Sequence, residues 1–190
     1  LDDLERVHGG PLERLHDVGA GVGLFMEAAR KRGIRVSGNE LNGYAVRAMR
    51  ERQIRHLVTG GTFNAKYSPG GLVDVEYLVQ GLQINHGTDD PDVRQTNIRA
   101  AMQMLAEKGI LSGDAYRRLR RAHTFLRWLI DGLRMVRGNA KDLTVPPVET
   151  EAFAFLARRL RYEDHIEILH EDLIQHTTAV QKLNQALLGS

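Results

Sequence analysis

The sequence predicts a mainly α protein, a helical bundle with a short N-terminal strand–helix–strand segment of α/β type. Three observations lead to this fold class. After residue 91, apolar residues recur at spacings of three and four, the period of helices with one buried face. Glycine is frequent up to Gly87 and scarce afterwards. Between residues 12 and 41 the pattern is instead strand, glycine-rich turn, helix and strand.

Residues 1–60 form the glycine-rich part of the chain, which we expect to be a partial α/β segment. One strand is predicted to end at Asp17 and another to cover Ile34–Ser37, with a helix at Leu24–Arg32 between them. Residues 61–190 are predicted to form the helical bundle domain, because a helix with an apolar face must bury that face against other helices.

The stretch from residue 72 to residue 86 has two possible interpretations. Its first part, Val73–Tyr77, alternates between apolar and other residues like a strand. The whole run is longer than a typical strand. The apolar residues that recur at helical spacing are Leu72, Val75, Val79 and Leu82. We therefore predict a helix over Leu72–His86.

Four further helices are predicted downstream. They span Asp92–Lys108, Gly113–Arg137, Glu149–Arg161 and Glu163–Leu188. The second of them has the clearest apolar stripe, and Arg120, Arg127 and Arg134 recur every seven residues beside it. Gly109 and Gly138 stand where helix C-caps belong.

The composition is that of a globular protein and excludes several classes. Of the 190 residues, 42% are apolar and 26% are charged, so general disorder is not expected. The lack of cysteine excludes a disulfide scaffold, a thiolate zinc site and a cysteine nucleophile, and it fits a reducing, cytoplasmic location. No apolar run approaches the roughly 20 residues of a membrane helix, so no membrane partner is expected. The first residues lack Met and do not resemble a signal peptide, which suggests a fragment or a processed chain.

The formal net charge of +2 conceals an asymmetry along the chain. From Arg94 to Lys141 there are eleven Lys or Arg and three acidic residues, a difference of +8, whereas Glu163–Asp172 contains five acids and no Lys or Arg. Such a split suits an anionic ligand of the middle region, internal pairing of the two segments, or simply a solvated basic face. The cluster Arg117–Arg121 has few interleaved aromatic residues, so nucleic acid is not an expected partner.

A glycine-rich turn follows the first predicted strand. It contains Asp17, Gly19 and Gly21, and Glu40 follows the second strand. Glycines let the backbone approach a ligand, a helix N-terminus offers free N–H groups, and an acid after the second strand accepts ribose hydroxyls. Residues 12–52 resemble the first motif of class I S-adenosylmethionine-dependent methyltransferases, which implies that these four residues bind S-adenosylmethionine. A segment without any cofactor is the alternative.

A second unusual segment lies immediately before the first predicted bundle helix. Lys66 is followed by a tight turn and by Gly70 and Gly71. The helix then carries Asp74 and Glu76 on different faces. A lysine beside an accessible helix N-terminus suits a phosphate group. The same residues also suit a turn that docks the helix against a neighbour, with the two acids holding N-terminal amides or nearby arginines.

This segment resembles the helical domain of glutamine synthetase adenylyltransferases and of their relatives, the PII-protein uridylyltransferases. The residues that match the family pattern in order are Lys66, Gly70, Gly71, Asp74, Glu76, Tyr77 and Gln80. Similar stretches follow at 97–112, 125–135, 139–146 and 155–162. The resemblance covers about residues 44–190.

The resemblance implies a helical companion domain of a nucleotidyltransferase, which supports nucleotide or protein-substrate binding. The residues implied to lie near nucleotide or phosphate are Lys66, Gly70, Gly71, Asp74, Glu76, Arg127 and Arg134. ATP and magnesium are implied for a full adenylyltransferase. The implied partner is a nucleotidyltransferase catalytic domain, or a protein substrate such as glutamine synthetase.

In this family the chemistry resides in a separate domain, marked by a Gly-Ser turn followed by Asp-x-Asp, whose acids hold magnesium. The present sequence has Asp90 and Asp92 on either side of a proline but no such turn, so we expect turn and N-cap roles for them. The chain alone is therefore not expected to be catalytic or to hold a cofactor.

His165, His170 and His176 are spaced too irregularly for one helical face, so no metal site is expected. A non-catalytic interaction module is the third interpretation.

Overall fold

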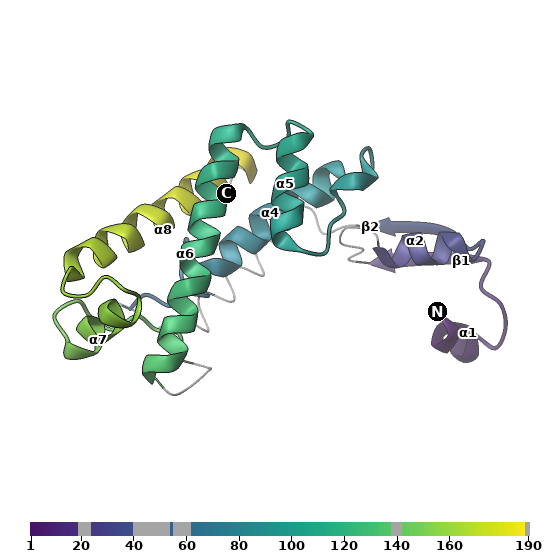
Figure 1. Ribbon diagram of the computed structural model, residues 1–190. Helices are drawn as coiled ribbons and strands as arrows, with labels where there is room; N and C mark the ends of the chain where they lie inside the picture. The colour runs from purple at the N-terminus through teal and green to yellow at the C-terminus, as the bar shows by residue number, and fades with distance from the viewer. Residues whose placement is uncertain (19–23, 40–53, 55–61, 138–141, 189–190) are drawn as a thin grey trace.

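The computed structural model describes residues 1–18, 24–39, 54, 62–137 and 142–188. Over these residues the chain is mainly helical, with a two-stranded parallel sheet near the N-terminus, which confirms the predicted fold class. Helix α6 runs through the middle of a bundle, and the strand–helix–strand unit lies to one side of it (Figure 1). Of the described helices, none combines the length and the apolar character that crossing a membrane requires.

The N-terminal elements form the expected strand–helix–strand unit. They are α1 (Asp2–His8), β1 (Arg14–Val18), α2 (Leu24–Lys31) and β2 (Arg35–Asn39). The two strands pair in parallel, from Arg14 opposite Arg35 to Val18 opposite Asn39, and α2 packs on both. The sequence patterns did not predict α1, a helix without buried residues whose apolar side chains Leu4 and Val7 are exposed.

The bundle contains one 3₁₀ helix and five α-helices in the described part of the chain. They are α4 (Leu72–His86), η1 (Pro91–Val93), α5 (Ile98–Glu107), α6 (Gly113–Arg137), α7 (Glu151–Arg159) and α8 (Ile166–Leu188). Helices α4 and α6 have the predicted bounds. The predicted C-cap at Gly138 and the predicted domain division between residues 60 and 61 lie outside the described residues, and that division stays a prediction.

The predicted start of α5 at Asp92 is wrong, because two successive caps interrupt the chain there. Asp90 caps η1 by accepting the Asp92 amide, as its predicted N-cap role requires. Asn97 then caps α5 by accepting the amides of Arg99 and Ala100. A polar side chain that accepts these first amides starts a new helix rather than continuing an old one.

Helices α7 and α8 also begin later than predicted. Thr150 caps α7 by accepting the Phe153 amide, so this helix starts at Glu151 and not at Glu149. Arg161 and Glu163 adopt positive φ angles of 57° and 51°, which a right-handed helix does not allow. Helix α8 therefore starts at Ile166 and not at Glu163.

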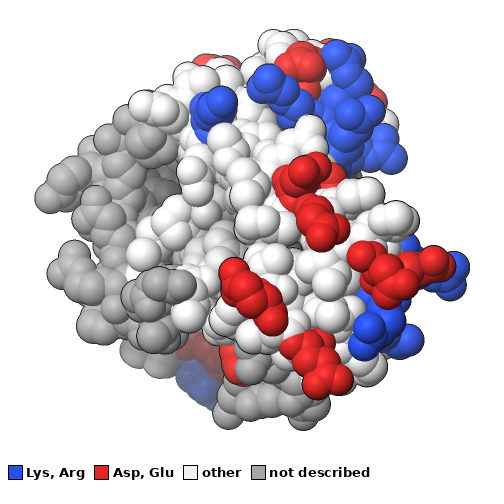
Figure 2. Space-filling model, turned by 90° about the vertical axis from the view of Figure 1, so that its left-hand side faces the viewer, with Lys and Arg blue, Asp and Glu red and all other residues white. Residues whose placement is uncertain are grey.

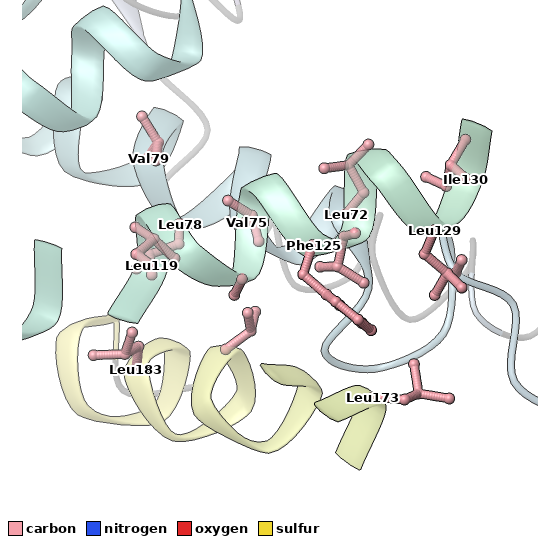
Figure 3. Packing of buried hydrophobic residues seen from close by; sticks show 14 of the residues in the cluster. Leu72, Val75, Leu78, Val79, Leu119, Phe125, Leu129, Ile130, Leu173 and Leu183 are labelled. Carbon is pink, nitrogen blue, oxygen red and sulfur yellow. The ribbon is translucent and has the colours of Figure 1, made fainter. Parts of the chain in front are cut away.

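The core of the bundle is an apolar cluster shared mainly by α4, α6 and α8, whose side chains point toward one another (Figure 3). Leu78, Leu119 and Leu126 have no exposed surface. Ala29 and Ile34 are also buried, but they lie under the N-terminal strands and are not part of this cluster. Burial of this kind stabilises the bundle by about 1.5 to 3 kcal/mol for each large side chain.

Helix α8 closes the bundle by packing directly on the turn before α4. Gly70 lies there with a φ of 80°, and a Cβ at this position would overlap the main chain of Thr177 in α8. The Gln181 side chain donates to the Pro69 carbonyl at 3.0 Å, and the Asn184 side chain donates to the Asp74 carbonyl at 3.4 Å. The backbones approach so closely that only glycine fits.

We expect Gly70→Ala to destabilise the chain by about 2 to 4 kcal/mol, because the new methyl group both collides with α8 and strains the backbone. Gly109 is the matched control, since it also has positive φ, at 72°, but faces open space. Gly109→Ala should cost about 1 kcal/mol. Urea denaturation measures both values, and equal losses would show that contact with Thr177 does not constrain position 70.

Candidate functional site

The main-chain N–H groups at the end of the turn from Lys66 to Gly71 are already hydrogen-bonded to groups of the turn itself and of the start of α4. Asp74 accepts the Gly70 amide through Oδ2 at 2.6 Å, and the Gly71 amide donates to the Ser68 carbonyl at 2.8 Å. The next two amides donate to the carbonyls of Ala65 and Lys66 at 3.0 Å each. A phosphate bound at the start of α4 would need these same amides as hydrogen-bond donors. The geometry thus matches the interpretation of a docking turn, and a phosphate-binding role for Lys66, Gly70 and Gly71 stays a prediction.

The other residues of this segment do not converge on a common point. Asp74 faces back toward the turn, and Glu76 lies half-buried further along α4. The Lys66 ammonium group lies 5.0 Å from the centre of the Tyr67 ring. None of these side chains lines the cleft described next.

An open cleft of about 920 Å³ lies along α6. Most of its lining comes from one face of that helix, with Arg99 from α5, Tyr162 from the α7–α8 connection, and two residues of α8. The lining residues are Arg99, Tyr116, Arg117, Arg120, Arg121, Thr124, Phe125, Arg127, Trp128, Asp131, Tyr162, Asp172 and His176. Thus the cleft is assembled from segments that are up to 77 residues apart (Arg99 to His176).

The cleft carries an excess of positive charge, with five arginines against Asp131 and Asp172. Arg117 lies 3.5 Å from Asp114, outside the cleft. The other four arginines have no acidic group within ion-pair distance in the described part of the chain. Figure 2 shows one face of the molecule, where basic side chains gather toward one edge and acidic ones spread across the middle. The cleft is therefore suited to an anionic ligand.

The predicted anion contacts are separated by the structure. Arg127 lines the cleft, whereas Arg134 does not, and its guanidinium binds Asp131 at 3.1 Å. An anion-binding role for either arginine stays a prediction. Internal pairing between the basic middle and the acidic segment Glu163–Asp172, one of the three interpretations of the charge asymmetry, is not seen among the described residues, whose ion pairs all join other groups.

Aromatic side chains form the floor and one side of the cleft. Phe125 is buried, with its ring centre 4.6 Å from that of His176. Trp128 is 41% exposed, and its ring centre lies 5.9 Å from that of Tyr162. The Tyr162 hydroxyl donates to Asp172 Oδ2 at 2.6 Å, which fixes the ring and one carboxylate at once. Apolar surface is thus exposed between cationic groups.

Burial and neighbouring charges set the ionisation of the cleft. Burial raises the pKa of Tyr162, and its bond to Asp172 raises that pKa further, so the hydroxyl remains a donor. Burial also lowers the pKa of His176, and the Arg121 charge lowers it further, against the opposing effect of Asp172. The neutral form of this imidazole is therefore favoured.

His123 lies behind the cleft with an unusual environment. It is buried in α6, and its Nδ1 has no hydrogen-bond partner in the structure. Burial, together with the nearby charges of Arg99 and Arg127, lowers the pKa of His123 to about 4. The protein thus keeps this ring neutral at physiological pH, which avoids a buried charge beside two arginines.

Sequence reasoning found only part of the cleft, namely three arginines of the cluster Arg117–Arg121 and Arg127. The seven-residue repeat of arginines indicated Arg120 and Arg127, but no local pattern connects Arg99, Tyr162 and His176 to them.

Within the described residues, no three His, Asp or Glu side chains gather as a metal site would need. Asp17 lies in β1 opposite Gly38. The other residues of the proposed S-adenosylmethionine site, Gly19, Gly21 and Glu40, lie outside the described residues.

Comparison with protein families gives a match that includes every residue of the cleft. The family model described as GlnD PII-uridylyltransferase matches residues 45–188. The chain belongs to this family. The resemblance inferred from residues 44–190 is thereby confirmed, and residues 1–44 lie outside the match.

Individual members of the GlnD PII-uridylyltransferase family and its relatives agree with this assignment. The chain is 31% identical over 149 residues to the bifunctional glutamine synthetase adenylyltransferase/adenylyl-removing enzyme of Mycobacterium bovis, which covers 75% of the chain and 15% of that protein. The enzymes of the same name from Streptomyces avermitilis and Xanthomonas campestris are 34% and 33% identical over 101 and 115 residues. These alignments cover 53% and 60% of the chain. The chain spans 10% to 15% of the length of these three relatives.

We expect His123 to make the stability of the chain depend on pH. The pKa of this ring is about 4 in the folded chain and 6.5 ordinarily, so the unfolded chain binds more protons between these values. Stability contributed by the neutral ring is present above pH 6.5 and is lost as the pH falls to 4, by about 1 to 3 kcal/mol. The variant His123→Leu lacks this titrating group, so its free energy of unfolding should depend less steeply on pH. Urea denaturation at several pH values compares the two proteins, and parallel curves would contradict the assignment.

Proposed function

We propose that this chain is a helical companion domain of a nucleotidyltransferase, and that its basic cleft supports the binding of a nucleotide or of a protein substrate. The five arginines around an open, partly aromatic cleft carry this proposal. The family match over residues 45–188 and the adenylyltransferase names of the relatives support it. By the same names, glutamine synthetase is the protein substrate to test and ATP the nucleotide.

The chemistry itself is assigned to another domain under this proposal. Magnesium ions in such enzymes are held by clustered acids, and the described residues contain no cluster of that kind. Asp90 and Asp92 instead bind the Lys108 ammonium group at 2.9 Å and 2.8 Å. The contribution of this chain is to hold negative charge through groups such as Arg127, while Lys66, Asp74 and Glu76 are proposed to face the neighbouring domain.

We expect Arg127→Ala to weaken the binding of ATP or of glutamine synthetase by about threefold to tenfold, because a charged contact to the ligand is lost. Arg118→Ala is the matched control, since Arg118 lies on the same helix but binds Asp114 and does not line the cleft. Isothermal titration calorimetry with each ligand measures the dissociation constants. Absence of binding by both ligands, or equal losses in the two variants, would contradict the proposal.

A second candidate function concerns the N-terminal unit alone. The parallel pairing of β1 with β2 across α2 is the arrangement that precedes a nucleoside site in α/β folds, and it favours S-adenosylmethionine binding near Asp17. This role requires Gly19, Gly21 and Glu40 to complete the site. It is independent of the cleft, so both functions can hold in one chain.

The S-adenosylmethionine proposal is tested by calorimetry with that compound. We expect a binding signal at concentrations of about 1 mM or below, and a loss of that signal in Glu40→Ala, because the ribose hydroxyls would donate hydrogen bonds to this carboxylate. The Arg127→Ala variant serves as the comparison, since its change lies in the bundle. A flat titration of the unaltered chain would remove this candidate.

A further inference from the structure

The cleft is elongated along α6. Its lining positions Arg117, Arg120, Thr124 and Trp128 follow one another at spacings of three and four and therefore form one face of the helix. From Arg117 to Arg127 the helix rises by about 15 Å. An extended peptide covers this distance with about five residues. The lining thus extends along the helix, and Arg117, Arg120 and Arg127 are spread over this length.

The donors of the cleft differ from those of a usual polyphosphate site. Such sites use main-chain N–H groups at loops or helix starts, which converge on one phosphate. Here the lining residues lie on helices except for Tyr162, and the five arginines are all exposed side chains. The start of α5 lies at one end of the cleft, but the Asn97 side chain already accepts the amides of Arg99 and Ala100. The geometry therefore favours several separate anionic groups over one compact polyphosphate.

The aromatic part of the cleft adds a place for an apolar side chain. Trp128 is exposed by 41% beside Tyr162, and buried Phe125 and partly buried His176 also line the cleft. Tyr, Trp and Arg are the residue types that contribute most to the affinity of protein interfaces. Tyr162 is held in place by Asp172, so little side-chain freedom would be lost when a ligand packs there.

We propose that this cleft binds an acidic segment of a partner protein, with an apolar side chain packed against Trp128 and carboxylates bound to Arg99, Arg120, Arg121 and Arg127. This inference rests on the proposed function and names the protein, not the nucleotide, as the ligand of the cleft. We choose an acidic segment as the ligand on the basis of charge complementarity, because four cationic groups of the cleft lack an acidic partner among the described residues.

The experiment uses the whole 190-residue chain and fluorescence anisotropy of labelled peptides. The first probe is a short peptide in which Glu and Asp flank a central Leu-Phe pair. The second replaces this pair with Gly-Ser, and the third replaces the acids with Lys. ATP is titrated in parallel, alone and as a competitor of the first probe. We expect the first probe to bind best, the second about threefold to tenfold more weakly, and the third not at all.

Variants of the cleft locate the binding site. Arg120→Ala and Arg127→Ala should each weaken binding of the first probe by about threefold to tenfold. In Trp128→Ala, the first probe should bind no more tightly than the Gly-Ser probe. Arg118→Ala is the control on the same helix and should have no effect beyond the salt-dependent loss of one distant charge. These side chains are exposed, so their truncation should leave the fold intact, and circular dichroism verifies this.

Three outcomes would overturn the inference. If the acidic probe fails to bind but ATP binds in an Arg127-dependent way, the proposed function stands and the cleft is a nucleotide site. If neither binds, and glutamine synthetase also gives no signal, both the inference and the proposed function fail. If the chain forms a dimer that Arg120→Ala dissociates in sedimentation experiments, the acidic segment Glu163–Asp172 of a second copy is the occupant.

Discussion

The contact between the turn before α4 and the backbone of α8 is the constraint on which the rest of the bundle depends. Gly70 allows this turn to touch the main chain at Thr177, and the side chains of Gln181 and Asn184 secure it with two hydrogen bonds. His176, the neighbour of Thr177 in sequence, lines the cleft. The glycine contact therefore also determines where one wall of the cleft lies relative to α6.

The positive charge of the cleft remains because the acidic side chains of the bundle bind other groups. Asp114 and Asp131 bind Arg118 and Arg134 on α6, and Asp172 accepts the Tyr162 hydroxyl. Apart from Arg117, the arginines of the cleft face solvent without an acidic partner among the described residues, at a cost in mutual repulsion that an anionic ligand would remove. The proposed binding of an anionic ligand would account for this arrangement.

The candidate site was only partly predictable, and particular residues show why. The helical period indicated that Arg120 and Arg127 share one face of α6, and the structure places both in the cleft. Arg134 extends the same repeat, but Asp131 engages it at 3.1 Å. Gly70 and Gly71 resembled a phosphate loop by sequence, whereas their amides are used internally and the missing side chains make room for α8 and for carbonyl oxygens. A glycine pair cannot by itself reveal whether the space beside it holds a ligand or another helix.

The sequence by itself determined the local features of this protein: the bounds of α4 and α6, the strand–helix–strand unit, the charge asymmetry and the family resemblance. These depend on hydrophobic period and on short motifs, which are encoded within a few consecutive residues. Only the tertiary structure decided the use of the glycine turn and the composition of the cleft. Both depend on segments that are 77 and 112 positions apart in the chain: Arg99 and His176 line one cleft, and the Gln181 side chain donates to the Pro69 carbonyl. Packing rather than local preference sets those contacts.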